Sequence, residues 1–175
     1  MKKLAFLLVT LIFLTACQSN WVVDVDLTAE EKAEIQADIK DIKSRLSADM
    51  KSSDYIQAVI SLARKYEDLG QLSDAIDVYV DTLKNENLSA PTVNRNLALL
   101  YEKIGKFEKA IEQYQILIDK YLDENYLYDI TWAYINMGER REAEKYFNAW
   151  QLKFQKTDVQ TQDAIKKLRE EEKDL

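Results

Sequence analysis

The sequence predicts an all-α protein, a right-handed solenoid of three stacked helix pairs with a capping helix at each end. The first observation is a unit that occurs three times, with successive copies 35 and 33 residues apart. The second is that the chain has only three glycines, one at the same point of each copy: Gly70, Gly105 and Gly138. A repeat of this length indicates a solenoid in which each unit packs on its neighbours.

Each copy of the unit carries apolar, small and aromatic residues at the same spacing. A tyrosine is followed by glycine four positions later, by alanine after five more and by an aromatic residue after another four. The matching positions are Leu62, Ala63, Tyr66, Ala75 and Tyr79; Leu97, Ala98, Tyr101, Ala110 and Tyr114; and Ile130, Thr131, Tyr134, Ala143 and Phe147. At these residues the unit resembles the tetratricopeptide repeat, a helix–turn–helix unit of about 34 residues.

The resemblance to the tetratricopeptide-repeat family covers approximately residues 55–154. It implies a turn at each glycine, close helix contacts at the small residues, and a binding scaffold for peptides or partner proteins. The sequence departs from the family pattern at Val59, Asn94 and Leu127, where the family often has tryptophan, and at Thr131, which replaces a smaller residue. The proline that often ends a repeat is also missing.

The pattern assigns residues 51–155 to the three repeats. Ser53 or Asp54 is the expected N-cap of the first helix. Pro91 suits the first turn of its helix, where a missing N–H costs nothing. We expect the tyrosines of the pattern to fill the core. The six expected helices span residues 54–68, 73–85, 91–103, 106–121, 124–137 and 139–155.

An N-terminal capping helix is expected over residues 28–50. Thr28 and Glu31 predict a capping box at its start. The helix has one narrow apolar stripe, made of Ile35, Ile39, Ile42 and Leu46. This stripe either covers the end of the first repeat or pairs with the same helix in a second copy of the chain. We favour the cover, because terminal repeats need a polar outer covering.

A C-terminal capping helix is expected over residues 156–175. Thr157 and Gln160 predict a second capping box at its start. The helix ends in a fully polar tail, which is typical of a solvating end helix. We expect it to cover Trp150 and Phe154 on the preceding helix. Its large apolar residues are Val159, Ile165 and Leu168.

Residues 1–16 predict a lipoprotein signal peptide. A basic start precedes thirteen largely apolar residues, fewer than the roughly 20 that span a bilayer. The run ends in Leu14-Thr15-Ala16-Cys17, which resembles the lipobox of bacterial lipoproteins. The resemblance implies that Cys17 carries the lipid, including palmitate-type acyl chains, and becomes the first mature residue. The alternative is a plain secretory signal followed by a chance cysteine.

Residues 17–27 are then a lipidated tether. Gln18, rather than aspartate, follows Cys17, which in two-membrane bacteria usually goes with outer-membrane sorting. The tether is made apolar by Trp21, Val22, Val23 and Val25, so we expect it to lie at the lipid interface or to pack on the folded domain. The sequence therefore predicts a protein of the cell envelope, anchored to a membrane and facing the periplasm or the exterior.

Composition excludes several classes of function. The net charge of −7 argues against nucleic-acid partners, which need a basic surface. The absence of histidine excludes a Ser-His-Asp triad and a histidine-based zinc site, and the single cysteine excludes an intramolecular disulfide. The acidic pairs Glu30-Glu31, Asp123-Glu124 and Glu171-Glu172 have no phosphate loop or EF-hand pattern beside them. We expect no cofactor, no metal and no enzymatic activity.

One helix face could bind a partner. Beside the core stripe of residues 124–137, a second apolar stripe holds Tyr128, Trp132 and Ile135. The equivalent positions in the first two repeats are Ile60, Arg64, Arg95 and Leu99. Stacked, these seven residues would line a concave surface, and arginines beside aromatic residues suit a carboxylate or an extended peptide. The alternative is that the tether or the C-terminal helix covers this surface.

These observations predict a non-catalytic, lipid-anchored scaffold that recruits or positions partner proteins in the bacterial envelope. Outer-membrane assembly, pilus biogenesis and cell-wall enzyme recruitment are the roles that similar lipoproteins suggest. The alternative is a structural lipoprotein that forms a homodimer through its N-terminal helix.

Overall fold

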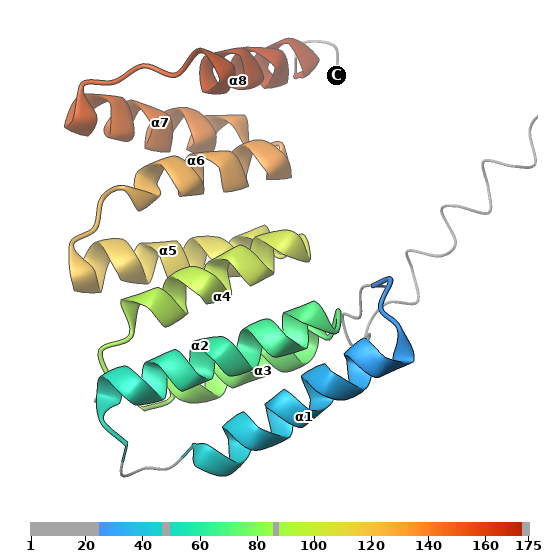
Figure 1. The fold of residues 1–175 in the computed structure, drawn as a ribbon. Helices are drawn as coiled ribbons and strands as arrows, with labels where there is room; N and C mark the ends of the chain where they lie inside the picture. Colours follow the sequence, from blue (N-terminus) through green and yellow to red (C-terminus); the bar gives the residue numbers. More distant parts are fainter. Residues whose placement is uncertain (1–24, 47–49, 86–87, 173–175) are drawn as a thin grey trace, which may run out of the picture.

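The computed structural model describes residues 25–46, 50–85 and 88–172, and within these ranges all regular structure is helical. Helices α2 to α7 form three antiparallel pairs, stacked one on the next, with α1 and α8 at the two ends (Figure 1). The predicted all-α solenoid of three helix pairs with two end helices is confirmed. The helices are α1 (Ala29–Arg45), α2 (Ser52–Asp68), α3 (Leu72–Leu83), α4 (Pro91–Lys103), α5 (Phe107–Tyr121), α6 (Tyr126–Met137), α7 (Arg140–Phe154) and α8 (Val159–Glu171).

The signal peptide, Cys17 and most of the tether lie outside the described residues. Among the residues that the structure describes, no helix is long and apolar enough to cross a membrane.

The glycines close the turn within each helix pair, as predicted. Gly105 and Gly138 have φ values of 72° and 76°, a left-handed conformation that costs residues with a side chain about 1–2 kcal/mol. The N–H groups of the next residues, Lys106 and Glu139, bond back to the carbonyls of Tyr101 at 2.8 Å and Tyr134 at 2.9 Å. A Cβ atom on either glycine would meet no heavy atom within 4 Å. The turns therefore need glycine for its backbone conformation and not for space.

The core runs continuously through the three repeats. Tyr79 and Tyr114 are each 1% exposed, whereas Tyr66 and Tyr134 lie at the edge of the core and are half-buried. Ala98 and Thr131, at equivalent small-residue positions, are fully buried. The Thr131 hydroxyl fits there because it donates to the carbonyl oxygen of Leu127, four residues earlier, at 2.9 Å.

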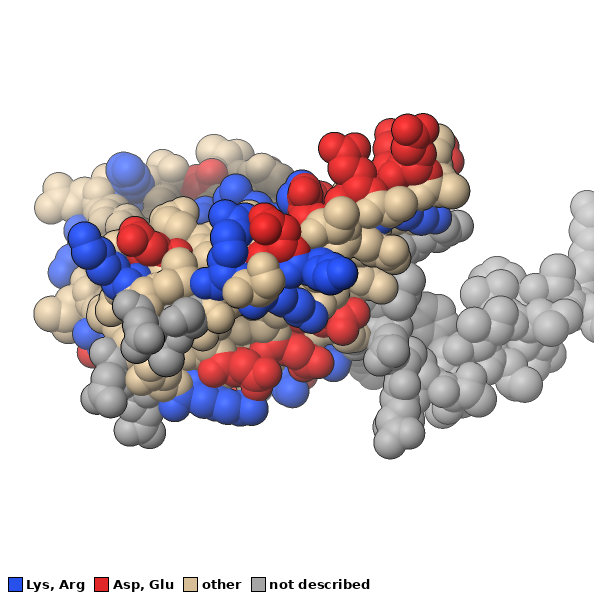
Figure 2. Space-filling view, turned by 60° about the horizontal axis from the view of Figure 1, so that its bottom comes forward, with Lys and Arg blue, Asp and Glu red and all other residues tan. Residues whose placement is uncertain are grey.

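At the N-terminal end, α1 covers the first repeat. Ile39 and Ile42 pack on Leu62 of α2, so the apolar stripe is buried within a single chain. Lys65 of α2 also pairs with Asp38 of α1 at 2.7 Å. On the side of the molecule that α1 occupies, basic and acidic side chains lie next to one another (Figure 2). The stripe that the homodimer hypothesis requires is thus occupied by α2.

Two of the three predicted N-caps are wrong. The capping box at Thr28 forms, with the Glu31 carboxylate accepting from the Thr28 N–H at 2.8 Å. Helix α2, however, begins at Ser52 without a side-chain cap, not at Ser53 or Asp54. Helix α8 is capped by Asp158 and not by Thr157. The Asp158 carboxylate accepts from the Thr161 N–H at 2.7 Å, because a carboxylate is the stronger acceptor for a backbone N–H.

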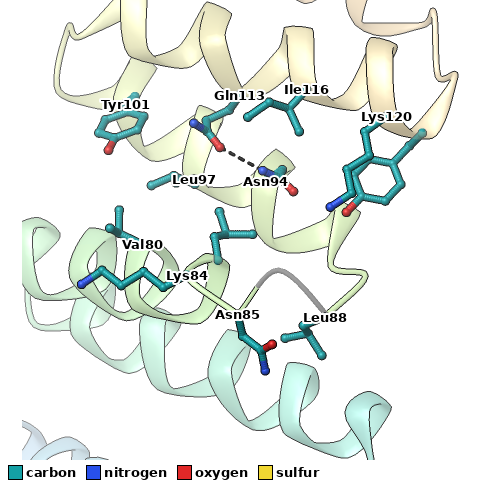
Figure 3. A pocket seen from close by; sticks show the side chains of 12 residues that line it. Val80, Lys84, Asn85, Leu88, Asn94, Leu97, Tyr101, Gln113, Ile116 and Lys120 are labelled. Atoms are coloured by element: carbon teal, nitrogen blue, oxygen red, sulfur yellow. Dashed lines mark hydrogen bonds between the residues drawn. The ribbon is translucent and has the colours of Figure 1, made fainter.

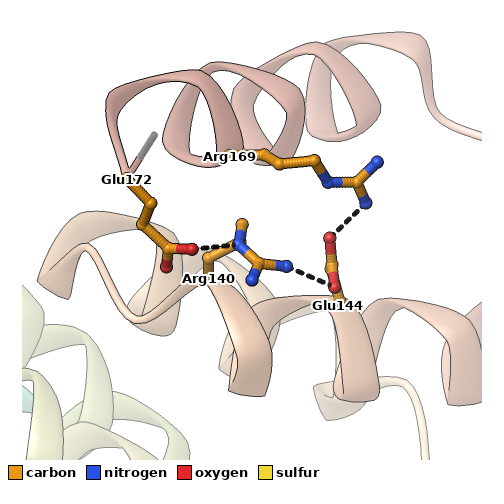
Figure 4. Close-up of polar contacts among 4 residues, drawn as sticks. All are labelled: Arg140, Glu144, Arg169 and Glu172. Atoms are coloured by element: carbon orange, nitrogen blue, oxygen red, sulfur yellow. Dashed lines mark hydrogen bonds and ion pairs between the residues drawn. The ribbon is translucent and has the colours of Figure 1, made fainter. Parts of the chain in front are cut away.

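At the C-terminal end, α8 packs on α6 and α7. Ile165 of α8 joins Ala143 and Phe147 of α7, and Trp150 packs against this cluster. Ionic contacts hold the other edge of α8 (Figure 4). Arg140 bridges Glu144 at 2.8 Å and Glu172 at 2.7 Å, and Arg169 pairs with Glu144. The predicted cover over Trp150 is therefore present, although Val159 at the start of α8 is exposed.

Candidate functional site

The predicted binding surface lies on α2, α4 and α6, the first helices of the three pairs. We call it the first-helix face, after Arg64 on α2, Arg95 and Leu99 on α4, and Trp132 on α6. Arg64 and Arg95 are exposed, Leu99 is 41% exposed, and Trp132 is half-buried. These four residues are accessible, as a binding surface requires.

The structure brings Arg64 and Leu99 together, although they belong to different repeats. They line a hollow of about 160 Å³ between α2 and α4. A salt bridge of 3.7 Å between Glu67 and Lys103 forms part of its wall. The full lining is Arg64, Glu67, Asn96, Leu99, Leu100 and Lys103. A charged and apolar hollow of this size fits one or two side chains of a bound peptide, not a whole small molecule.

Ile60 is not part of this surface, which corrects the sequence prediction. Its side chain is 6% exposed and belongs to the core cluster that the first two repeats share, beside Val59 and Ala63. Burying an isoleucine contributes about 1.5–3 kcal/mol, so this position stabilises the fold itself.

Tyr128 and Ile135 on α6 are covered by the chain itself. The Tyr128 ring lies 4.9 Å from that of Trp150, and its hydroxyl is hydrogen bonded to the Thr161 hydroxyl of α8 at 3.2 Å. Ile135 packs on the cluster of Ala143, Phe147 and Ile165. Of the two interpretations of this surface, cover by the C-terminal helix therefore holds for the third repeat.

At the junction between the first and second repeats, the Tyr79 hydroxyl and the Glu67 carboxylate are both paired. The Tyr79 hydroxyl, on a side chain that is 1% exposed, accepts from the Asn96 amide at 3.4 Å. Glu67 is paired with Lys103, which offsets part of the burial that raises the pKa of the Glu67 carboxyl.

The junction between the second and third repeats is different. The Tyr114 hydroxyl is buried and has no hydrogen-bond partner. Burial, together with the negative charges of Glu102 and Asp129 beside it, raises the pKa of the Tyr114 hydroxyl. Burial raises the pKa of both carboxyls, and the Arg95 guanidinium partly offsets this for Asp129. The ring of Tyr126 closes over that of Tyr114, with 5.5 Å between centroids.

The carboxylates and the two tyrosine hydroxyls of these junctions are not among the site residues that the sequence predicts. A signal was available, because Asn96 and Asp129 occupy equivalent positions in successive repeats, as do Lys103 and Asn136. A charge that changes between equivalent positions of a repeat is not required by the fold.

A larger cavity of about 420 Å³ opens on the other side of α4, between α3 and α5 (Figure 3). Asn94 donates a hydrogen bond to Gln113 there at 2.9 Å. Asn94 stands where the repeat family often has tryptophan, and the smaller side chain leaves space. None of the seven predicted residues lines this cavity. Its lining is Val80, Leu83, Lys84, Asn85, Leu88, Asn94, Leu97, Tyr101, Gln113, Ile116, Lys120 and Tyr121.

No group of three or more His, Cys, Asp or Glu side chains within the described ranges could hold a metal ion.

Comparison with known proteins agrees with this geometry. Residues 95–125, from α4 through α5, match the family profile of the tetratricopeptide repeat. A crystal structure of a tetratricopeptide repeat protein from Parabacteroides merdae is similar to this chain, with a TM-score of 0.64 and 21% identity. The match covers 81% of this chain and 56% of that one, so this chain spans just over half of that protein's length. No curated protein matches significantly. The repeat match and the shared fold support a tetratricopeptide-repeat protein.

Proposed function

We propose that the protein is a non-catalytic scaffold that binds an extended segment of a partner protein along the first-helix face. The observation that carries this proposal is the hollow between α2 and α4, where Arg64 and Leu99 of different repeats meet in the open. Since α8 covers Tyr128 and Ile135, the open surface runs from α2 across α4 to the edge of α6. A tetratricopeptide-repeat fold suggests a protein partner.

A photo-crosslinking residue in the full-length protein in live cells tests this surface. At Leu99 on α4, which is 41% exposed, we expect a discrete adduct with one partner. The matched control is Ile116 on α5, which is 38% exposed and lines the cavity on the other side of α4. An adduct at Ile116 with none at Leu99 would move the binding site to that cavity.

We also propose that this scaffold acts in the bacterial cell envelope, anchored by lipid at Cys17. The support is the leader, with its basic start, short apolar run and lipobox-like Leu14-Thr15-Ala16-Cys17. The scaffold would then serve outer-membrane assembly, pilus biogenesis or recruitment of cell-wall enzymes. Cys17→Ser should leave an unprocessed or soluble protein, and a mature-sized variant that still partitions with membranes would exclude the lipid anchor.

The homodimer through α1 is the second candidate, and the burial of Ile39 and Ile42 against Leu62 weighs against it. Sedimentation of the mature protein distinguishes the two. We expect a monomer. A dimer that dissociates when Ile35 or Leu46 is replaced by a charged residue would favour self-association.

A further inference from the structure

The two repeat junctions can be compared position by position, because the helices that form them are equivalent. Tyr79 and Tyr114 are equivalent residues, and each is 1% exposed. Asn96, which bonds to the Tyr79 hydroxyl, is equivalent to Asp129, whose charge acts on the Tyr114 hydroxyl in the second junction. The amide of Asn96 donates to the Tyr79 hydroxyl at 3.4 Å, whereas an ionised carboxylate can only accept from a tyrosine hydroxyl. The Tyr114 hydroxyl is left without a partner.

The first helix of each pair carries a glutamate at the junction, and the partner of this glutamate differs between the two junctions. Glu67 in the first junction pairs with Lys103 at 3.7 Å. Glu102 is its equivalent in the second junction, and the residue equivalent to Lys103 is Asn136, which is neutral. The second junction therefore holds two carboxylates, from Glu102 and Asp129, and these repel each other.

One arginine does not neutralise this pair. Arg95 is exposed and acts on Asp129 from the side of α4. The junction keeps one negative charge in excess, at carboxylates that are only partly exposed. Uncompensated charge at half-buried positions destabilises a protein, so a fold under no other constraint would replace it.

We propose that the junction between the second and third repeats is a subsite for a cationic side chain, in which Glu102 and Asp129 bind a lysine ammonium or an arginine guanidinium of the partner segment. The proposal rests on the first-helix face as the binding surface, and it names what that surface recognises. The bound cation supplies the charge that Lys103 supplies to Glu67. With one carboxylate turned to the ligand, the Tyr114 hydroxyl can donate to the other.

The surroundings of the two carboxylates suit a side chain with a long apolar stem. Leu99 lies three residues before Glu102 on α4, and Trp132 lies three residues after Asp129 on α6. Residues three apart on a helix are neighbours, so each carboxylate has an apolar contact surface beside it. The methylene stem of lysine or arginine packs on such a surface while its charged end reaches the acids.

The chemistry can be tested without knowing the partner. The full-length protein in detergent, labelled with ¹³C at the Asp and Glu carboxyls, is titrated with n-butylammonium chloride. We expect the Glu102 and Asp129 resonances to shift saturably, whereas n-butanol and sodium chloride at matched concentrations leave them unchanged. Equal, non-saturating shifts at all carboxyls, or the same response to sodium chloride, would overturn the subsite. Such a failure leaves the Leu99 crosslink, and therefore the scaffold proposal, unaffected.

Asp129→Asn is the decisive variant, because it copies Asn96 and so keeps the fold. We expect it to weaken n-butylammonium binding by about 10-fold or more. The matched control is Asp77→Asn on the exposed face of α3, which removes the same charge and should change affinity less than 2-fold, as an order-of-magnitude bound. Equal effects of the two variants would reduce the site to diffuse electrostatics and contradict the proposal.

A peptide measurement extends the test to the partner. A library of N-acetylated, C-amidated decapeptides is selected on the full-length protein, and we expect lysine or arginine to be enriched at one position. Replacing that lysine by norleucine should weaken binding at least about 10-fold in the wild type and much less in Asp129→Asn. Selected peptides without an enriched basic residue, or equal losses in the two proteins, would refute the cationic subsite.

Discussion

The two repeat junctions of this molecule share their shape and differ in their polar groups. Tyr79 and Tyr114 fill equivalent places in the core. In the first junction the hydroxyl is paired with Asn96 and the nearby acid with Lys103. In the second, the same positions leave a buried hydroxyl without a partner. The repeat therefore determines the packing and leaves a few polar positions free to vary, and we expect the function to depend on those positions.

The tyrosine packing that both junctions share should give the greatest loss of stability when it is removed. Tyr79→Ala and Tyr114→Ala should each lower the free energy of unfolding by about 3–5 kcal/mol, because each opens a cavity in a closed core. Chemical denaturation of the two variants measures this. A loss at one junction of less than half that at the other would show that the junctions are not equivalent in packing.

Asn96→Asp tests the difference between the junctions from the first one. The change removes the donor to the Tyr79 hydroxyl and adds a carboxylate near Glu67, so we expect a loss of about 1–3 kcal/mol in the free energy of unfolding. Asn96→Ala is the control that removes the donor without adding charge. If the aspartate variant is as stable as the wild type, an acid at this position does not destabilise the junction, and the proposed difference between the two junctions is contradicted.

Removing the tyrosine hydroxyls should change the free energy of unfolding by a smaller amount, and differently at the two junctions. Tyr79→Phe loses a hydrogen bond and should cost about 0.5–1.5 kcal/mol. Tyr114→Phe removes a buried hydroxyl that has no partner, so the variant should be equal in stability to the wild type or more stable. Thermal unfolding of both variants checks this, and equal losses would mean that Tyr114 is hydrogen bonded in solution.

The ion pairs of α8 should lose their stabilising effect at acidic pH. Hydrogen bonds from Arg169 and Arg140 lower the pKa of the Glu144 carboxyl below its ordinary value of 4.5. The folded state thus releases this proton more readily than the unfolded state does. Its stabilising effect is present above about pH 4.5 and is lost as the pH falls through the lower, folded-state pKa.

We therefore expect acidification to loosen α8, with a small change in the fluorescence of Trp150, which packs beneath it. Glu144→Gln should show the looser state already at pH 7. A Trp150 signal that is independent of pH in the wild type would show that these ion pairs add nothing to the docking of α8.

The sequence predicts the periodic part of the fold well. Spacing determines the helix pairs, and each predicted turn glycine has the expected positive φ. The cap at Thr28 is also local, since its partner Glu31 lies three residues away. Asp158 was missed because two neighbouring residues can both cap a helix, and only the final geometry selects one.

Tertiary packing explains why the sequence prediction of the binding surface differs from the structure. Helical spacing places Ile60 and Arg64 on one face, but it does not show that a neighbouring helix closes over the isoleucine alone. In the same way, the spacing of Tyr128 and Ile135 predicts an apolar strip without showing that α8 fills it. Glu102 of α4 and Asp129 of α6 lie near Tyr114 of α5 only in the folded structure, so no pattern within one helix reveals such a site.

The unfolding free energy of Asp129→Asn, measured at pH 7 and near pH 3, shows whether the Asp129 charge destabilises the unliganded fold. Burial raises the pKa of Asp129 above its value in the unfolded chain, so stability falls as the pH rises through that window. With no ligand present, asparagine should therefore stabilise the protein by about 1 kcal/mol at pH 7. Near pH 3 the aspartate is largely protonated in both states, and the gain should vanish. A variant that is less stable than the wild type at pH 7 would show that Asp129 stabilises the fold, and would contradict its role in a cationic subsite.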